Sequence, residues 1–254
     1  MPGGHRLAVA FLLVSLYSMA VVFIDNHFFP KRVFQEIAPA LYGSVVMGVL
    51  LVFRTNSAYE RWWEARKLWG QLVNDTRNLV IKMRELARSA PDEQRHRFAQ
   101  LMTEFPVSLK EHLRGGTPAL SPIDLAGNIY HLLKEWLNGG VLTDITLGQL
   151  DLHARAMMDV CGACERIKKS PIAGSYKALL WMGMGLYFLF LPWVLVDVCE
   201  WWAVPIAFVS CYFLIGLELL AEEVEDPFGI NPNDLPLENI CLTIRESIDK
   251  IMAA

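Results

Sequence analysis

The residues that look most like a chemical site are a cysteine pair and an acidic group. Cys161 and Cys164 form a CxxC sequence. No second pair follows at zinc-site spacing, so two small residues on a helix are the better interpretation. A run of acidic residues follows an apolar stretch: Glu218, Glu222, Glu223, Glu225 and Asp226. They could bind calcium, but regular helical spacing fits a solvated helix end better than a looped oxygen cage.

The remaining polar residues do not form a recognisable catalytic motif. The six histidines are dispersed, and only folding could bring His112 and His131 together. The sequence has no phosphate-binding loop, no dinucleotide-binding glycine motif, no HExxH and no GxSxG. A net charge of -4 argues against nucleic-acid binding. We therefore expect neither an enzyme nor a nucleic-acid binder, and no metal ion or other cofactor.

Four uncharged apolar stretches indicate a membrane protein. They are Leu7–Ile24, Ile37–Phe53, Ala178–Val196 and Trp201–Leu217. Each is close to the ~18 residues that indicate a membrane-spanning helix. The first stretch is followed by Asp25-Asn26-His27 and not by a small-residue cleavage site, so we expect it to be retained. The sequence therefore predicts four spans.

The distribution of basic residues predicts the orientation of these spans. Of the 23 lysines and arginines, 18 lie between Arg54 and Lys177. The connection at 197–200 has none, and the connection at 25–36 has only two. Basic residues are enriched on the cytoplasmic side of a membrane. We therefore expect both termini and the middle segment to lie in the cytoplasm, with the spans in the plasma (inner) membrane.

The middle segment carries helix start and stop signals. They predict helices from about Ser89 to Gly115, from Ser121 to Gly139 and from about Thr146 to Lys169. Pro106 predicts a kink or break near Phe105 in the first of these. No stretch alternates apolar and polar residues for long enough to indicate a sheet. The predicted fold is all-α, with four transmembrane helices and a cytoplasmic helical insertion.

These observations divide the chain into four segments. Residues 1–56 hold transmembrane helices 1 and 2, and residues 57–177 form the cytoplasmic helical region. Residues 178–221 hold transmembrane helices 3 and 4, and residues 222–254 form a cytoplasmic C-terminal segment.

The second apolar stretch has two helical stripes. If it is helical, Val45, Val49 and Phe53 lie along one stripe. Ser44 and Gly48 form a small-residue pair on an adjoining stripe, which would allow neighbouring helices to approach closely. From periodicity alone, the first stripe faces lipid or the core of a helix bundle.

The stretch continues without glycine or proline into "FRTNSAYERWWEARKLWG" at 53–70. Tryptophan is enriched at membrane interfaces, so Trp62 and Trp63 are expected to act as interfacial anchors. Arg61 and Arg66 would lie at the level of the lipid headgroups. The charged aromatic run therefore predicts a girdle at the membrane surface.

This run, together with three further motifs, resembles the bestrophins, particularly their short prokaryotic homologues. The further motifs are "CERIKKSPIAGSY" at 164–176, "EDPFG" at 225–229 and "NDLPL" at 233–237. The Arg-Trp-Trp and Pro-Phe-Gly elements are specific in this order, and the resemblance covers nearly the whole chain.

The resemblance implies a homopentameric ion channel in a lipid membrane, with one pore lined by the second helix of each subunit. The apolar neck positions of the family fall on Val45, Val49 and Phe53, which replaces the lipid-facing interpretation of this stripe. Five copies would stack apolar rings that can close by dewetting. A second apolar constriction aligns loosely near Ile145. Arg61, Trp62 and Trp63 would fix the helix at the interface.

The resemblance leaves the permeating ion open. Bestrophins are usually described as passing chloride and other anions, so small monovalent anions are the expected ions. The outer connections here are mildly acidic, which favours cations in the local field. A cation-selective (sodium-type) channel and a non-conducting membrane scaffold are the alternatives.

Calcium gating is where the sequence departs from animal bestrophins. In those proteins an acidic run after Pro-Phe-Gly contributes to a calcium clasp. Here Gly229 is followed by Ile230-Asn231-Pro232-Asn233-Asp234, which keeps only the carboxylate of Asp234. A calcium site needs roughly six to eight oxygen ligands, several of them charged.

We therefore predict that channel open probability does not depend on calcium. Single-channel recordings in chelator and in roughly millimolar calcium, the weak end of biological sites, should give the same open probability. Reproducible activation by calcium would show that the 230–238 stretch has been misinterpreted.

Overall fold

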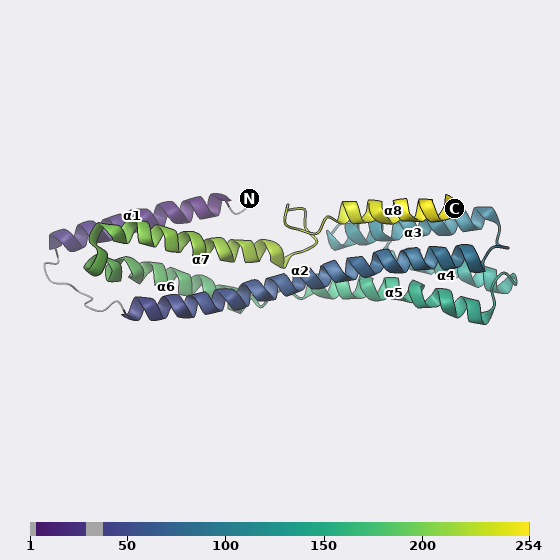
Figure 1. The fold of residues 1–254 in the computed structure, drawn as a ribbon, viewed down its shortest axis with the longest axis horizontal. Coiled ribbons are helices and arrows are strands. Elements are labelled where there is room, and N and C mark those ends of the chain that lie inside the picture. The colour runs from purple at the N-terminus through teal and green to yellow at the C-terminus, as the bar shows by residue number, and fades with distance from the viewer. Residues whose placement is uncertain (1–3, 29–37, 254) are drawn as a thin grey trace. The chain divides into compact units, whose positions relative to one another are not determined.

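The computed structural model describes residues 4–28 and 38–253, and the side chains of 38–41 also lie outside the description. The charges assigned to the outer connection at Lys31, Arg32 and Glu36, and the start of the second span at Ile37, fall outside these residues. The described chain is helical and contains no strand, which confirms the predicted all-α class (Figure 1). It forms two compact units. Unit 1 is Met1–Glu60 with Ile172–Glu225, and unit 2 is Arg61–Pro171 with Asp226–Ala254.

Unit 1 is built from apolar helices. It contains α1 (Gly4–Phe28), the first part of α2 (Ala38–Leu86), α6 (Gly174–Cys199), the short 3-10 helix η1 (Glu200–Trp202) and α7 (Ala203–Glu225). Helices α1, α6 and α7 lie against one another (Figure 1). Among the described residues, Gly4–Phe28 and Gly174–Glu225 are long and apolar enough to cross a membrane. The second of these segments contains both α6 and α7.

Aromatic side chains join the helices of unit 1. The rings of Phe11 and Phe208 pack with centroids 4.7 Å apart and join α1 to α7. The hydroxyl of Tyr17 donates to the backbone oxygen of Leu189 (2.9 Å) and joins α1 to α6. The hydroxyl of Tyr176 donates to the backbone oxygen of Leu50 (2.9 Å) and joins α6 to α2. These bonds satisfy the polar tips of tyrosines whose bodies are apolar.

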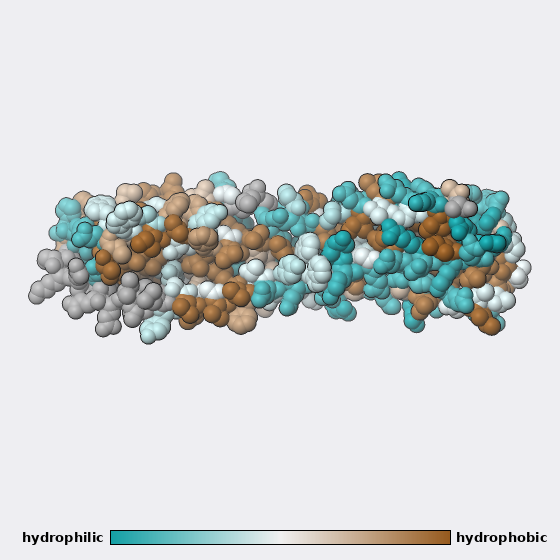
Figure 2. All heavy atoms as spheres, viewed as in Figure 1, coloured by the Kyte–Doolittle hydropathy of each residue, from teal (hydrophilic) through white to brown (hydrophobic). Residues whose placement is uncertain are grey.

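The outer surface of unit 1 is also apolar. Large exposed side chains occur on each of its long helices, including Leu12, Phe23, Met182, Phe190 and Phe213. On the face shown in Figure 2, brown side chains gather over α1, α6 and α7, whereas teal side chains predominate over α3, α5, α8 and the second half of α2. Soluble proteins rarely expose so much contiguous apolar surface. The surface of unit 1 is therefore suited to lipid.

Unit 2 has an ordinary buried core. It contains the rest of α2 with α3 (Asp92–Leu113), α4 (Pro122–Asn138), α5 (Asp144–Lys169) and α8 (Leu237–Ala253). Large side chains fill its centre: Trp69, Phe98, Phe105, Trp136 and Phe228. The rings of Phe98 and Trp136 lie 5.4 Å apart, and the indole Nε1 of Trp136 donates to Gln94 Oε1 (2.6 Å). Burying each phenylalanine contributes about 1.5–3 kcal/mol.

The ends of the unit 2 helices follow the local signals closely, with small exceptions. Helix α4 begins where predicted, and Ser121 caps it in a capping box with Asp124. Thr143 caps α5, which therefore begins two residues before the expected Thr146. Helix α3 begins at Asp92 after Pro91, without a side-chain cap from Ser89.

Of the kink or break predicted near Phe105, the break is wrong. Helix α3 continues through Pro106 to Leu113. Proline removes one hydrogen bond of the helix. Here Phe105 and Pro106 are both buried in the core of unit 2, and tertiary packing of this face supports the helix across the missing bond.

Helix α2 is continuous from Ala38 to Leu86, which confirms the unbroken helix predicted from the absence of glycine and proline breaks. One stripe of α2 is buried in each unit. In unit 1 it comprises Met47, Leu51, Arg54 and Ala58, and in unit 2 it continues through Ala65, Trp69, Leu72, Thr76, Leu79 and Met83. Steps of three and four residues, and one step of seven between Ala58 and Ala65, keep these side chains on one face of a helix. This buried stripe determines which face of α2 is left uncovered.

Helix α8 is held at its start by Arg114, the residue that follows α3. Both guanidinium nitrogens Nη1 and Nη2 of Arg114 bond the two carboxylate oxygens of Glu238, in the first turn of α8. Arg114 also donates to the backbone oxygens of Phe228 (3.3 Å) and Gly229 (3.1 Å). The Arg114 guanidinium lowers the pKa of Glu238 to about 2. One arginine thus joins three segments of unit 2.

Replacing Glu238 with glutamine should lower the thermal stability of unit 2 in a pH-dependent manner. Because the pKa of the folded carboxyl is below its usual value, its contribution is fully present above about pH 4.5 and is lost as the pH falls toward 2. The pair is partly exposed, so about 0.2–1 kcal/mol is expected at neutral pH. Thermal unfolding in detergent at pH 7, 5 and 3 should show a difference between wild type and Glu238→Gln that shrinks with the pH.

Glu246→Gln provides the matched control for this measurement. Glu246 is exposed on the same helix, and no ion pair with it occurs among the described residues. Its replacement should leave the unfolding temperature nearly unchanged. A difference between wild type and Glu238→Gln that is as large at pH 3 as at pH 7 would contradict the assigned ion pair.

Candidate functional site

The three predicted neck residues share one uncovered face of α2. Val45 is 65% exposed, Val49 48% and Phe53 61%. Met47 and Leu51, two residues after Val45 and Val49, are buried. Two residues correspond to a rotation of about 200° in a helix. The valines therefore point away from the helices of their own unit.

The uncovered face of α2 changes from apolar to polar along the helix. After Phe53 the exposed residues include Asn56, Ser57, Glu60 and Glu64. Gly48 belongs to the adjoining small-residue stripe. A Cβ added to Gly48 would meet no atom of another described part of the chain within 4 Å. The surface available to a partner or a solvent path is thus an apolar band followed by a hydrophilic one.

The second predicted constriction residue is also uncovered. Ile145, the second residue of α5 in unit 2, is 78% exposed. An isoleucine this exposed gains nothing from the core of its own unit. Its place in a constriction stays a prediction.

The three girdle residues have different environments in unit 2. The guanidinium of Arg61 donates to the backbone oxygens of Ile167 (2.7 Å) and Ser170, at the end of α5. The indole Nε1 of Trp62 donates to the backbone oxygen of Asn233 (3.1 Å). Trp63 is about half exposed. Arg61 and Trp62 therefore fasten α2 to two other segments of unit 2, and a position at the membrane surface stays a prediction for all three.

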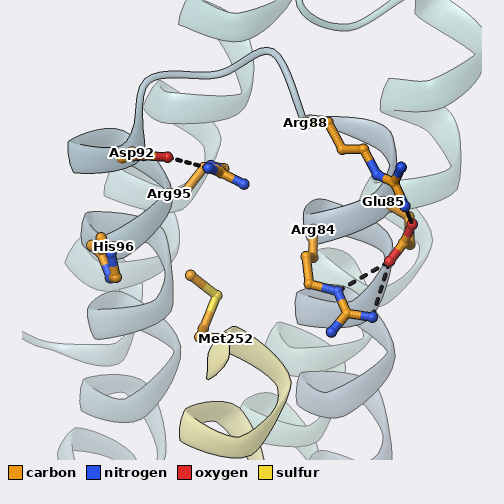
Figure 3. Close-up of a pocket in the computed structure, with 7 residues that line it drawn as sticks. All are labelled: Arg84, Glu85, Arg88, Asp92, Arg95, His96 and Met252. Carbon is orange, nitrogen blue, oxygen red and sulfur yellow. Dashed lines mark hydrogen bonds and ion pairs between the residues drawn. The ribbon is translucent and has the colours of Figure 1, made fainter. Parts of the chain in front are cut away.

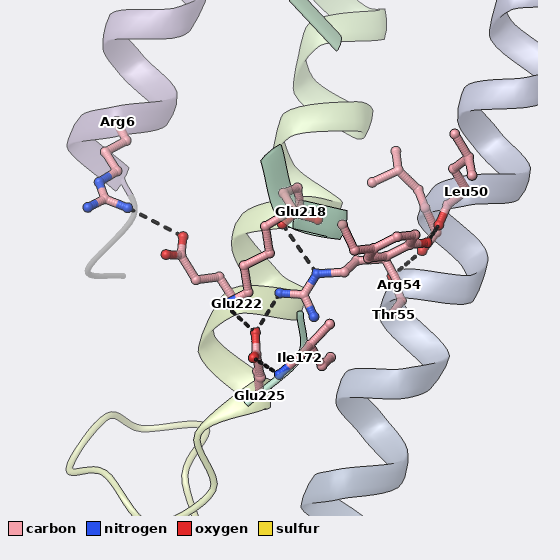
Figure 4. A network of polar contacts seen from close by, with 11 residues as sticks. Arg6, Leu50, Arg54, Thr55, Ile172, Glu218, Glu222 and Glu225 are labelled. Carbon is pink, nitrogen blue, oxygen red and sulfur yellow. Dashed lines mark hydrogen bonds and ion pairs between the residues drawn. The ribbon is translucent and has the colours of Figure 1, made fainter. Parts of the chain in front are cut away.

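A buried ion-pair network in unit 1 was not anticipated from the sequence (Figure 4). Arg54, in the buried stripe of α2, is fully inaccessible to solvent. Glu218 and Glu225 of α7 are almost fully inaccessible. Arg54 Nε donates to Glu218 Oε1 at 3.3 Å, and Arg54 Nη2 donates to Glu225 Oε2 at 2.7 Å. The interpretation of the acidic group as a solvated helix end is therefore wrong for these two residues.

Glu225 connects this network to the start of α6. Its Oε1 accepts a hydrogen bond from the backbone nitrogen of Ile172 (3.0 Å), and its Oε2 lies 2.7 Å from Lys177 Nζ. Two cations, Arg54 and Lys177, thus balance two buried carboxylates. Desolvating each ion costs several kcal/mol, which only a well-paired network can offset. One signal was present in the sequence: Arg54 continues the periodicity of Met47 and Leu51 on the buried face.

The turn after Pro-Phe-Gly in unit 2 uses its carboxylate structurally. Asp234 Oδ2 accepts a hydrogen bond from the backbone nitrogen of Asn231 (2.6 Å). A Cβ on Gly229 would collide with the same oxygen, so a larger residue there would displace the Asp234 side chain. In the described part of the chain, no group of three or more His, Cys, Asp or Glu side chains is placed to hold a metal ion.

The cysteine pair and the histidines have ordinary surroundings. Burial raises the pKa of the Cys161 thiol to about 11 and that of Cys164 to about 12, so both are protonated at neutral pH. His112 bonds Glu165 (2.8 Å), and the exposed His131 lies 3.8 Å from Glu135 on its own helix. These residues give no catalytic constellation.

A polar cavity of about 620 Å³ lies in unit 2, among residues of α2, α3 and α8 and of the connection between α2 and α3 (Figure 3). Its lining includes three arginines and two carboxylates: Arg84, Arg88, Arg95, Glu85 and Asp92. Glu85 pairs with Arg84 and Arg88, and Asp92 pairs with Arg95. The charges are therefore largely compensated, and the cavity is a weaker candidate site than the uncovered face of α2.

Comparison with known proteins agrees with the motifs. The sequence model of the family described as Bacterial/Fungal Bestrophin protein matches residues 4–138 and 119–250. A voltage-dependent anion channel-forming protein of Escherichia coli is 34% identical over 259 residues, with 94% of this chain and 84% of that protein covered. A protein of the same description from Nostoc is 33% identical over 241 residues, with 85% of this chain and 78% of that protein covered.

The fold agrees with solved structures. A bacterial bestrophin homologue from Klebsiella pneumoniae superposes with a TM-score of 0.91 at 25% identity, and the match covers 98% of this chain and 100% of that one. The four motifs, the sequence relatives and the fold point to one family. The chain belongs to the bacterial and fungal bestrophins.

Proposed function

We propose that this protein is the subunit of a homopentameric anion channel in the plasma (inner) membrane. The pore is lined by the uncovered face of α2, and its neck consists of rings of Val45, Val49 and Phe53. Ile145 contributes a second constriction on the cytoplasmic side. The protein works by ion permeation and not by enzyme chemistry.

One observation carries this proposal. The residues that the family resemblance assigns to the neck are all among the apolar side chains that the fold of a single chain leaves uncovered on α2. Uncovered apolar side chains would be a liability in water, but in a closed ring they form a dewetting gate. The polar residues that follow Phe53 suit a wider, hydrated part of the same pathway.

The membrane assignment has independent support. Gly4–Phe28 and Gly174–Glu225 have the length and composition of membrane segments, and the helices of unit 1 expose apolar side chains of the kind that contact lipid. We propose four spans, with α2 supplying the second, and place both termini in the cytoplasm on the distribution of basic residues.

The assignment of anions as the permeating ions rests on the relatives, which are described as voltage-dependent anion channel-forming proteins. Apolar rings do not by themselves select the sign of an ion. Cation passage is the second candidate, because Asp25 and Asp197 lie at the ends of α1 and α6 that we assign to the outer side. A negative mouth would concentrate cations.

Replacing Val49 with alanine should increase the current. The substitution removes two methyl groups per subunit, widens the ring and lowers the hydration barrier of the neck. A barrier lowered by about 1 kcal/mol raises the current about fivefold. Val49→Ser, which adds hydroxyls that replace lost hydration, should increase it at least as much. Conductance and open probability in planar bilayers provide the measurement.

Val9 supplies the matched control. It is a valine of similar exposure on α1, where we expect lipid contact. Val9→Ala should leave the current almost unchanged, and all variants must retain the wild-type pentameric mass in mild detergent. Unaltered currents in both Val49 variants would mean that the pore runs elsewhere, and a wild-type mass of only one or two subunits would contradict the channel itself.

A further inference from the structure

Arg54 is the one charged side chain among the buried residues of α2 within unit 1. It follows Phe53 directly, and it shares the buried stripe with Met47, Leu51 and Ala58. Its three companions make apolar contacts, which are not directional. Such contacts hold α2 against its neighbours but leave its rotation weakly defined. Arg54 is different because its hydrogen bonds fix a direction.

The geometry of Arg54 resists rotation of α2. Its Nε and Nη2 reach two different carboxylates, Glu218 and Glu225, one near the end of α7 and one at its last residue. A guanidinium is a planar, rigid fork, so bonds from two of its nitrogens set both its position and its orientation. Rotating α2 would separate buried charges, which is strongly unfavourable at low dielectric.

One of the two carboxylates, Glu225, is itself restrained by other groups. Glu225 is held by the backbone nitrogen of Ile172, just before α6, and by Lys177 in the first turn of α6. Arg54 is therefore bonded to a carboxylate of α7 that Ile172 and Lys177 already hold, and not to a mobile surface group. The exposed pair Arg6–Glu222 nearby has no such support.

We propose that Arg54 is the positioning residue of the channel neck. Its bonds to Glu218 and Glu225 set the rotation of α2, so that Phe53, about 100° away on the helix, and Val49, one turn earlier, face the pore. The inference rests on the proposed function, since it assumes that this face lines the pathway. It adds a residue that never contacts the ion and acts only through the neck side chains.

The test measures the accessibility of a thiol introduced as Val49→Cys in a Cys199→Ser background. Cys199 is the partly exposed native cysteine, and the other four are buried. A charged, membrane-impermeant methanethiosulfonate reagent is applied to the purified full-length pentamer, and the modification rate is compared with and without Arg54→Met/Glu218→Leu. Replacing both partners avoids leaving a buried charge unpaired, while Glu225 keeps Lys177 and Ile172.

We expect the double substitution to preserve the pentamer and to slow modification about tenfold, the ratio that corresponds to about 1.4 kcal/mol. Arg54→Lys keeps the charge but has no fork to reach both carboxylates, so it should slow modification less. If the double variant fails to assemble, the comparison of modification rates is made with Arg54→Lys instead. Arg6→Gln, which removes only the exposed pair, should leave the rate unchanged.

Two outcomes would overturn the proposal, and they are distinguishable. Equal modification rates with native Arg54, with Arg54→Lys and with the double substitution would show that other contacts set the rotation of α2, while the pore assignment would stand. If the introduced thiol is unreactive even with native Arg54, position 49 does not face an aqueous pathway. The proposed pore would then be wrong, and the positioning role with it.

Discussion

Burial of one continuous face of α2 is the constraint on which the rest of the structure depends. The helix contributes Met47, Leu51, Arg54 and Ala58 to the interior of unit 1, and it contributes Ala65, Trp69 and Leu72 to the core of unit 2. When one face of a helix is buried within its own chain, the opposite face is left to contact solvent, lipid or another subunit. In unit 1 the opposite face is apolar, and it carries the residues we assign to the neck.

The buried charges of unit 1 place a second demand on the same helix. An arginine in an apolar bundle is stable only where its partners are fixed, and Glu225 meets this requirement through its bonds to Ile172 and Lys177. Apolar packing supplies most of the attraction between these helices, whereas the ion pairs supply direction. The two effects together define a single rotation for α2, which a pore of five identical subunits would need.

Much of this arrangement could be predicted from local signals. The sequence shows the helix start at Ser121, the unbroken helix after Phe53 and the four-residue spacing of Val45, Val49 and Phe53. Features that depend on distant residues were missed. Glu218 and Glu225 looked solvated because their partner Arg54 lies more than 160 residues away. Helix α3 continued through Pro106 because the surrounding core supports it, and the start of α8 depends on Arg114 of another segment.

The most direct test of the channel is a recording from the purified wild-type protein in a planar bilayer with a chloride gradient. Apolar rings can gate a pathway without choosing the sign of the ion, so the reversal potential carries information that the neck cannot supply. An anion channel predicts stepwise currents that reverse near the equilibrium potential of chloride. Reversal near the equilibrium potential of the cation would replace the anion assignment, and the absence of stepwise current at any voltage from correctly assembled protein would contradict the account.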